Sequence, residues 1–152
     1  MDISREFGLT QEDVVLLVSR FTRWKGIEDL IDACRIMVDR GREFSCLLAG
    51  EALPEEKQYE EDLKTRVKEL GLDNVCFAGW RNDAAGLMKS SSVLVLPSHG
   101  EPFGRVIVEA WAAGLPVIAS DGGGPAEIIE SGVNGILTVA GDANSIADAI
   151  AG

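Results

Sequence analysis

Two glutamates, Glu101 and Glu109, lie eight positions apart in the segment "EPFGRVIVE". Glu101 precedes a Pro-Phe-Gly turn, where its carboxylate can accept hydrogen bonds from sugar hydroxyls. Glu109 lies between Val108 and Ala110, and a carboxylate in so apolar a segment needs partners that offset its desolvation. A ribose diol can donate two hydrogen bonds to such a carboxylate, as it does in dinucleotide-binding folds. The alternative for Glu109 is an ordinary glutamate on the solvent-facing side of a helix.

Two cations, Arg20 and Lys25, flank a short loop in the segment "SRFTRWKG". An arginine offers a planar fork of donors and a lysine a compact charge, so together with a helix N-terminus they can clamp a diphosphate. Gly104 lets the first amides of the next helix approach an anion or sugar hydroxyls closely. Neither the G-x-G-x-x-G pattern of dinucleotide-binding proteins nor a P-loop is present. Taken alone, Arg20 and Lys25 are better explained as solvated surface cations, and so is Arg23.

The composition is that of a small globular domain, and it argues against several classes of partner. The chain has 152 residues, of which 46% are hydrophobic and 26% are charged, which suits one domain with a buried core. Its net charge of −11 argues against binding to nucleic acids or anionic membranes, which requires cationic patches. No apolar run approaches the roughly 20 residues of a membrane span. Three scattered cysteines and a single histidine predict buried free thiols and no metal site.

Short apolar runs alternate with helical patterns along the chain. Strands are predicted at residues 14–18, 44–50, 74–79, 93–97, 116–120 and 134–139. Helices are predicted at 27–38, 59–70, 83–89, 105–113 and 126–131, with a loop at 121–125 and Asp142 as the N-cap of a last helix. Continuously apolar strands that alternate with helices predict an α/β fold, an open parallel sheet of about six strands with helices on both faces. Ligands of such sheets bind beyond the carboxyl ends of the strands, where the strand order reverses.

The chain resembles the C-terminal, nucleotide-sugar-binding domain of retaining glycosyltransferases of the GT-B fold, the large group 1 family. The resemblance lies in four segments that occur in the same order: "SRFTRWKGIEDLIDA", "PSHGEPFGRVIVEAWAAGLPVIAS", "GGGPAEII" and "GVNGIL". It extends from about Val14 to the end of the chain, and the two glutamates are its most specific element. It implies that residues 1–152 form one Rossmann-like donor-binding domain, half of a GT-B fold, excised from a longer two-domain enzyme.

The resemblance implies roles for the residues that match the family's motifs. Arg20 and Lys25 match the basic pair that neutralises the diphosphate of the donor, and Glu101 matches the glutamate beside the donor sugar; these three form the expected catalytic set. Glu109 matches the glutamate that holds the ribose hydroxyls. The remaining expected donor-binding residues are Phe103, Gly104 and Arg105, whose backbone amides contact sugar or phosphates, and Gly79, Trp80 and Arg81, which line the base pocket, often through backbone atoms.

The implied reaction is transfer of a hexosyl group from a nucleotide diphosphate sugar to an acceptor, with retention at the anomeric carbon. The expected partners are that donor and an N-terminal acceptor-binding domain of the full-length chain, with no nucleic acid and no membrane span in this segment. The resemblance implies no cofactor and no metal. It also implies a cytoplasmic enzyme, with any peripheral contact to a membrane made through the missing domain.

The sequence leaves two alternative functions open. The first is a nucleotide-sugar epimerase of similar fold, which would yield an epimerised product. The second is a non-catalytic nucleotide-sugar-binding or partner-binding module, which would have no reason to keep Arg20, Lys25, Glu101 and Glu109. Ser19 stands where the family usually has glycine, and "GEAL" at 50–53 replaces a glycine-rich turn; both affect how closely the donor fits. His99, in the loop before Glu101, is predicted to be incidental. Glu127 is predicted to position its loop.

Overall fold

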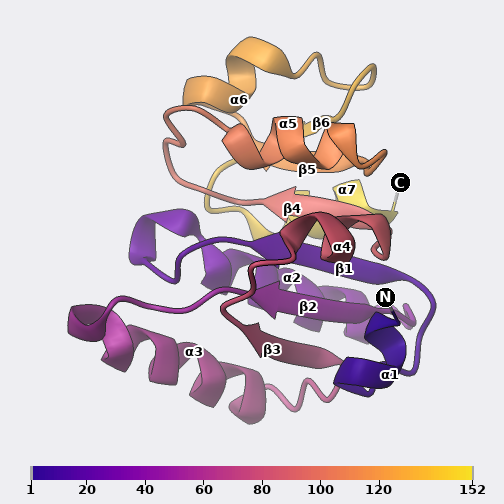
Figure 1. Cartoon of the computed structure of the whole chain (residues 1–152), viewed down its shortest axis with the longest axis vertical. Coiled ribbons are helices and arrows are strands. Elements are labelled where there is room, and N and C mark those ends of the chain that lie inside the picture. The colour runs from indigo at the N-terminus through magenta and orange to yellow at the C-terminus, as the bar shows by residue number, and fades with distance from the viewer. Residues whose placement is uncertain (1, 152) are drawn as a thin grey trace.

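The computed structural model describes residues 2–151, which form a sheet of six parallel strands in the order β3-β2-β1-β4-β5-β6 (Figure 1). The strands are β1 (Val14–Val18), β2 (Ser45–Ala49), β3 (Val75–Gly79), β4 (Val93–Leu96), β5 (Val117–Ser120) and β6 (Ile136–Thr138). The chain builds outward from β1 to β3, then returns to the other side of β1 to add β4. The strand order therefore reverses between β1 and β4, which is where such sheets bind ligands. The predicted fold class is confirmed.

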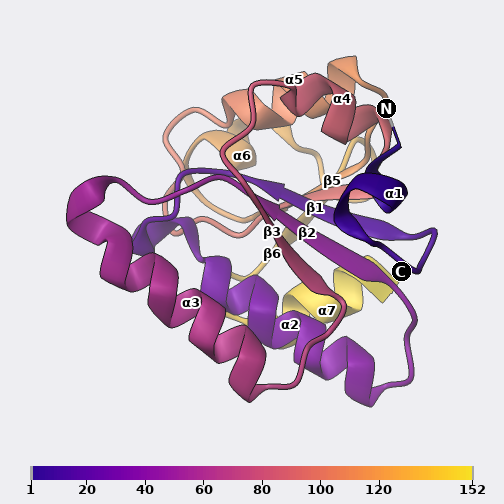
Figure 2. The ribbon, with the colours of Figure 1, turned by 60° about the horizontal axis from the view of Figure 1, so that its bottom comes forward.

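Helices cover both faces of the sheet, as Figure 2 shows. One face carries α2 (Ile27–Asp39), α3 (Lys57–Glu69) and α7 (Ala143–Ala151), and the other carries α1 (Ile3–Phe7), α4 (Ala84–Lys89) and α5 (Arg105–Ala112). The remaining elements are α6 (Gly123–Ile128) and two 3-10 turns, η1 (Arg23–Lys25) and η2 (Pro54–Glu56). This two-sided cover explains the continuously apolar strands, because residues on both faces of a strand must be buried.

β1 illustrates how the sequence pattern produces the two cores. Val15 and Leu17 pack with residues of α2, α3 and α7, whereas Val14 and Leu16 pack with residues of α1, α4 and α5. Side chains of a strand alternate between faces, so five consecutive apolar residues serve both cores. All three cysteines are free thiols, with Cys34 and Cys46 buried and Cys76 partly buried.

Two α-helices, α1 and α6, differ most from the sequence-based expectation. α1 is not predicted, because it has only five residues; Asp2 caps it by accepting a hydrogen bond from the Arg5 amide at 3.1 Å, and Ile3 anchors it in the core. α6 begins at Gly123 rather than at residue 126 and ends at Ile128. The early start follows from Pro125, which fits the first turn of a helix because no N–H is required there. Within residues 2–151, no helix is long and apolar enough to cross a membrane.

Candidate functional site

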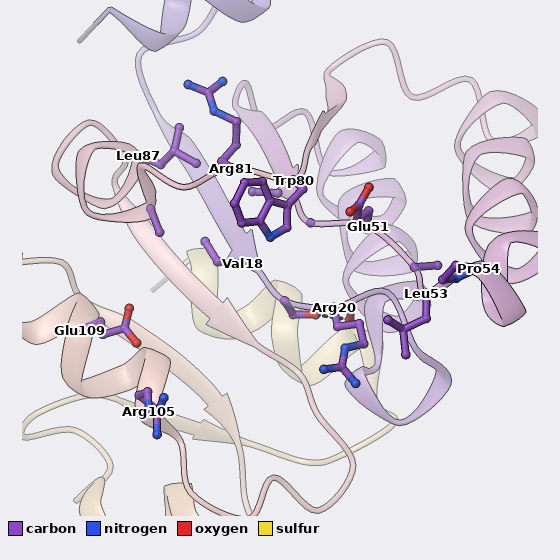
Figure 3. Close-up of a pocket in the computed structure, with 15 residues that line it drawn as sticks. Val18, Arg20, Glu51, Leu53, Pro54, Trp80, Arg81, Leu87, Arg105 and Glu109 are labelled. Carbon is purple, nitrogen blue, oxygen red and sulfur yellow. Dashed lines mark hydrogen bonds between the residues drawn. The ribbon is translucent and has the colours of Figure 1, made fainter.

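A pocket of about 750 Å³ lies beyond the carboxyl ends of β1, β2 and β3 (Figure 3). Its lining includes the segments that follow these strands, at residues 18–20, 49–54 and 80–81, together with two residues of α5. Arg105 and Glu109 project from α5 on one side of the pocket, and Trp80 and Arg20 lie on the other. Segments that are far apart in sequence thus meet at one edge of the sheet.

Three charged side chains in this pocket have no protein partner. Arg20, Arg105 and Glu109 are exposed, and within residues 2–151 none of them forms an ion pair or a side-chain hydrogen bond. Several charged side chains elsewhere on the surface form ion pairs, as Arg35 does with Asp39. Two free guanidinium groups and one free carboxylate in a single pocket suit a ligand that has both anionic groups and hydroxyls.

Lys25 and Glu101 lie outside the lining of this pocket and bind each other. Lys25 Nζ lies 2.9 Å from Glu101 Oε2, and the two side chains are only 17% and 12% exposed. The ammonium group also lies over the ring of Trp24, 4.2 Å from its centroid. The residue expected at the diphosphate is therefore joined to the residue expected at the sugar. A ligand that uses either residue must compete with its partner.

The loops that carry Lys25 and Glu101 are held together by their backbones. Gly26 has a φ of +68° and approaches Pro97 so closely that a Cβ would lie 2.1 Å from the Pro97 carbonyl oxygen. The backbone N–H of His99 donates to the Trp24 carbonyl at 2.6 Å, and its Nε2 lies 2.7 Å from Oδ2 of Asp29 on α2. His99 thus joins the loop after β4 to η1 through its backbone and to α2 through its side chain, a structural contact that the sequence pattern did not indicate.

A third loop supports Glu101 from the other side. The Gly124 amide donates to the Glu101 carbonyl at 2.7 Å, and a Cβ on Gly124 would lie 2.7 Å from the carbonyl oxygen of Pro102. The glycines of the "DGGGP" segment thus let α6 dock on the turn that precedes α5. Glu127 is exposed and forms no side-chain hydrogen bond or ion pair within the described residues, so this docking relies on the glycines.

The turn at the start of α5 presents backbone and apolar surface. Gly104 is buried and has a φ of +66°, a conformation that favours glycine, and it caps the N-terminus of α5. Phe103 beside it is 83% exposed. The Ile107 amide donates to the Gly104 carbonyl at 2.9 Å, which leaves the N–H groups of Arg105 and Val106 at the start of α5 to bind an anion.

The residues at the end of β3 and just after it line the pocket in part and bind other parts of the protein in part. The Gly79 carbonyl accepts a hydrogen bond from the Gly50 amide at 2.8 Å, and Trp80 is 65% exposed in the pocket. Arg81 also lines the pocket, but its guanidinium group donates to both oxygens of Asp83 and, at 2.7 Å, to Glu6 of α1. Hydrogen bonds to Asp83 and Glu6 raise the pKa of Arg81 and keep it charged. The Arg81 side chain is thus bound within the protein, which leaves its backbone for a ligand.

The loop at residues 50–53 is a larger part of the pocket than the sequence indicated. Glu51, Ala52 and Leu53 all line the pocket. Glu51 Oε2 lies 3.7 Å from Lys57 Nζ. In the sequence, this loop stood out only because "GEAL" replaces the glycine-rich turn that is usual in the group 1 family. Its apolar and acidic residues gave no sign of a ligand.

Residues 2–151 contain no group of three or more His, Cys, Asp or Glu side chains placed to hold a metal ion.

Comparisons with known proteins agree on one family. The family model described as glycosyl transferases group 1 matches residues 2–152. The lipopolysaccharide core biosynthesis glycosyltransferase LpsE of Rhizobium meliloti is 36% identical over 138 residues, which cover 90% of this chain and 38% of LpsE. The chain thus spans well under half the length of this relative.

Two solved structures share the fold closely. HepE of Anabaena, in complex with UDP and glucose, has a TM-score of 0.91 and 38% identity, covering 98% of this chain and 40% of HepE. The C-terminal domain of the group 1 glycosyltransferase LpcC from Francisella tularensis has a TM-score of 0.86 and 27% identity, covering 95% of this chain and 76% of that domain.

Proposed function

Because this chain belongs to the group 1 glycosyltransferases, we propose that its pocket binds a nucleotide diphosphate sugar as the donor for transfer of a hexosyl group. The observation that carries this proposal is the set of unpaired Arg20, Arg105 and Glu109 in one pocket at the carboxyl end of the sheet. Two cations suit a diphosphate, and a free carboxylate suits a ribose diol. The complex of HepE with UDP and glucose supports a uridine nucleotide as the first ligand to test.

Each part of the donor has a proposed partner. Glu109 accepts from the ribose hydroxyls, and the base lies against Trp80. Arg20, Arg105 and the first amides of α5 face the diphosphate. When the donor binds, the ion pair between Lys25 and Glu101 opens. Lys25 then binds the phosphates and Glu101 binds the sugar.

The proposed chemistry is electrostatic. The bond between the anomeric carbon and the diphosphate oxygen breaks, the acceptor oxygen bonds to the same face of that carbon, and the acceptor proton leaves with the diphosphate or solvent. Negative charge grows on the departing diphosphate, where fixed cations and helix amides stabilise it. Retention is tested by the NMR coupling constant of the anomeric proton in the product of the full-length enzyme. A product of inverted configuration would contradict it.

An acceptor-binding domain is proposed to complete the enzyme. The chain spans 38% of LpsE and 40% of HepE, so the regions of these relatives outside the match are longer than the match itself. The 152-residue chain is therefore expected to bind the donor without transferring its sugar.

The site is further proposed to work without a metal, so that EDTA leaves donor binding unchanged; loss of binding in EDTA would contradict this.

Calorimetric titration of the chain with UDP, GDP and ADP tests the proposed function. We expect one nucleoside diphosphate to bind at a single site with clear preference over the other two, and the matching nucleoside to bind more weakly. Failure of all three to bind would overturn the proposal. Incubation with UDP-glucose gives a second result: an epimerised nucleotide sugar would identify an epimerase instead.

Replacement of Glu109 tests the ribose contact. A 2′,3′-dideoxy nucleoside diphosphate cannot donate hydrogen bonds to this carboxylate, so we expect it to bind the parent chain about fivefold more weakly, equivalent to about 1 kcal/mol. Glu109→Ala should bind both nucleotides equally, because the discriminating acceptor is absent. Calorimetry with the two ligands measures this difference. If the mutant keeps the fivefold preference, another residue reads the ribose.

Replacement of Glu101 separates the phosphate contact from the sugar contact. In Glu101→Gln the Lys25 ammonium loses its anionic partner, so UDP should bind about threefold more tightly than to the parent, within the range of a part-exposed ion pair. The same variant should lose any extra affinity that the sugar gives UDP-glucose over UDP. Titration with both ligands gives the two numbers. Equal loss of affinity for UDP and UDP-glucose would contradict this division of roles.

A further inference from the structure

We propose that Glu60, a carboxylate on α3 outside the pocket, is a positioning residue for donor binding. It fixes the backbone of the loop Gly50–Leu53, which lies between the segments that carry Arg20 and Trp80. This inference rests on the proposed function, since it concerns the same pocket. Nothing in the sequence pattern distinguishes Glu60 from its neighbours in "YEEDLK".

Glu60 differs from the surface glutamates of α3 in its burial and its partners. The residue is 8% exposed, and its Oε1 accepts a hydrogen bond from the backbone N–H of Ala52 at 2.7 Å. Lys57 and Lys64 lie 3.5 and 3.4 Å from its two oxygens. By contrast, the side chain of Glu61 is 64% exposed. A buried carboxylate requires such partners, and here one partner is the backbone of the pocket wall.

The ionised state of Glu60 follows from these contacts. Burial by itself would raise its pKa, but the Ala52 amide and the two lysines outweigh burial, so the pKa of Glu60 is lowered. The carboxylate is therefore charged at neutral pH and forms a charge-assisted hydrogen bond with Ala52, which is stronger than a neutral one.

The loop that Glu60 holds connects both sides of the pocket. β2 lies between β1 and β3, so its following loop contacts the loops of both neighbours. The Glu51 carbonyl accepts from the Phe21 amide at 3.0 Å, next to Arg20, and the Gly50 amide donates to the Gly79 carbonyl at 2.8 Å, next to Trp80.

The contact between these loops is close. A Cβ on Gly50 would lie 1.8 Å from the Ser19 carbonyl oxygen, so the two backbones touch. A shift of the loop Gly50–Leu53 therefore moves Arg20 on one side and Trp80 on the other. Glu60 acts on the ligand through this backbone, without lining the pocket itself.

Three variants of the chain test the inference: Glu60→Ala, Glu60→Gln and, as the matched control, Glu61→Ala. Glu60→Ala removes the acceptor for the Ala52 amide and should weaken UDP binding by about fivefold to tenfold. Glu60→Gln keeps an uncharged acceptor and should recover binding to within about twofold of the parent. Glu61→Ala should bind UDP as the parent does. Circular dichroism establishes that each variant is folded at the temperature of the titration.

Two further readouts separate positioning from general stability. The Phe21 and Ala52 amides should exchange with deuterium faster in Glu60→Ala than in Glu61→Ala, because their shared loop is released. In an Arg20→Ala background, Glu60→Ala should weaken UDP binding by a smaller factor than in the parent chain, since one of the two residues that the loop positions is gone. If Glu60→Ala and Glu61→Ala bind UDP equally, or if the Glu60 effect is fully additive with Arg20→Ala, the inference is wrong. Absence of UDP binding in the parent chain would instead contradict the proposed function.

Discussion

Replacement of Arg20 or Lys25 by alanine is expected to weaken UDP binding by roughly tenfold to a hundredfold. Each side chain is proposed to make a charge-assisted contact with the diphosphate, worth about 1.5–3 kcal/mol. Lys25→Ala should have the larger effect, because it also leaves the carboxylate of Glu101, 12% exposed, without its cation and close to the phosphates. Calorimetric titration of each variant with UDP measures the loss.

The controls for this prediction are a neighbouring cation and a ligand without phosphate. Arg23 lies between the two residues in sequence, but its guanidinium group stacks on Tyr59, 4.7 Å from the ring centroid. Arg23→Ala should therefore bind UDP within about twofold of the parent. Uridine should bind the parent, Arg20→Ala and Lys25→Ala almost equally, and added salt should weaken UDP binding most in the parent. Parallel loss of uridine and UDP would show that the substitutions merely disturb the loop.

Gly26→Ala is expected to lower the free energy of unfolding by about 2–5 kcal/mol. A left-handed backbone conformation costs a residue with a Cβ about 1–2 kcal/mol. At this position the new Cβ would also lie 2.1 Å from the Pro97 carbonyl oxygen, and forced overpacking adds about 1–3 kcal/mol. The loops that carry Lys25 and Glu101 must then separate, so UDP binding should weaken as well. Urea unfolding followed by circular dichroism gives the change in stability.

Gly41→Ala provides the matched control for this prediction. Gly41 has a φ of +80°, but a Cβ there would meet no atom within 4 Å. It should cost only the conformational part, about 1–2 kcal/mol, and should leave UDP binding unchanged. Equal destabilisation by the two substitutions would mean that the close approach of Gly26 to Pro97 contributes nothing to stability.

The sequence was sufficient where local pattern and burial determine structure. The run at 14–18 is apolar at every position, and β1 occupies the same five residues. Gly104 permits the turn into α5, which begins at Arg105 as predicted. Because parallel strands end at one edge of a sheet, the same reasoning placed Arg20 and Glu109 at a common site, and both line the pocket.

The sequence was insufficient where a side chain finds its partner across the fold. Lys25 and Glu101 are 76 positions apart, and their ion pair depends on the contact of Gly26 with Pro97. Glu60 appears in a strongly charged helical segment, which is typical of a solvent-facing surface, yet it is buried against the pocket loop.

Arg81 and His99 also have partners that are distant in sequence. Arg81 lines the pocket as expected, but its guanidinium group is bound to Asp83 and Glu6. His99 was expected to be incidental to the site, and its Nε2 lies 2.7 Å from Oδ2 of Asp29 on α2. The spacing of the residues indicates neither the Arg81–Glu6 ion pair nor the His99–Asp29 contact.

The most direct test of the proposed donor site is a map of amide chemical shifts during titration of the isotopically labelled chain with UDP-glucose. We expect saturable shifts in the segments 19–21, 50–53, 79–81 and 101–109, with that of the Trp80 indole among the largest. These segments include residues that line the pocket and Glu101, the partner of Lys25. Shifts confined to other surfaces, or no shifts at saturating ligand, would contradict the assignment of this pocket as the donor site.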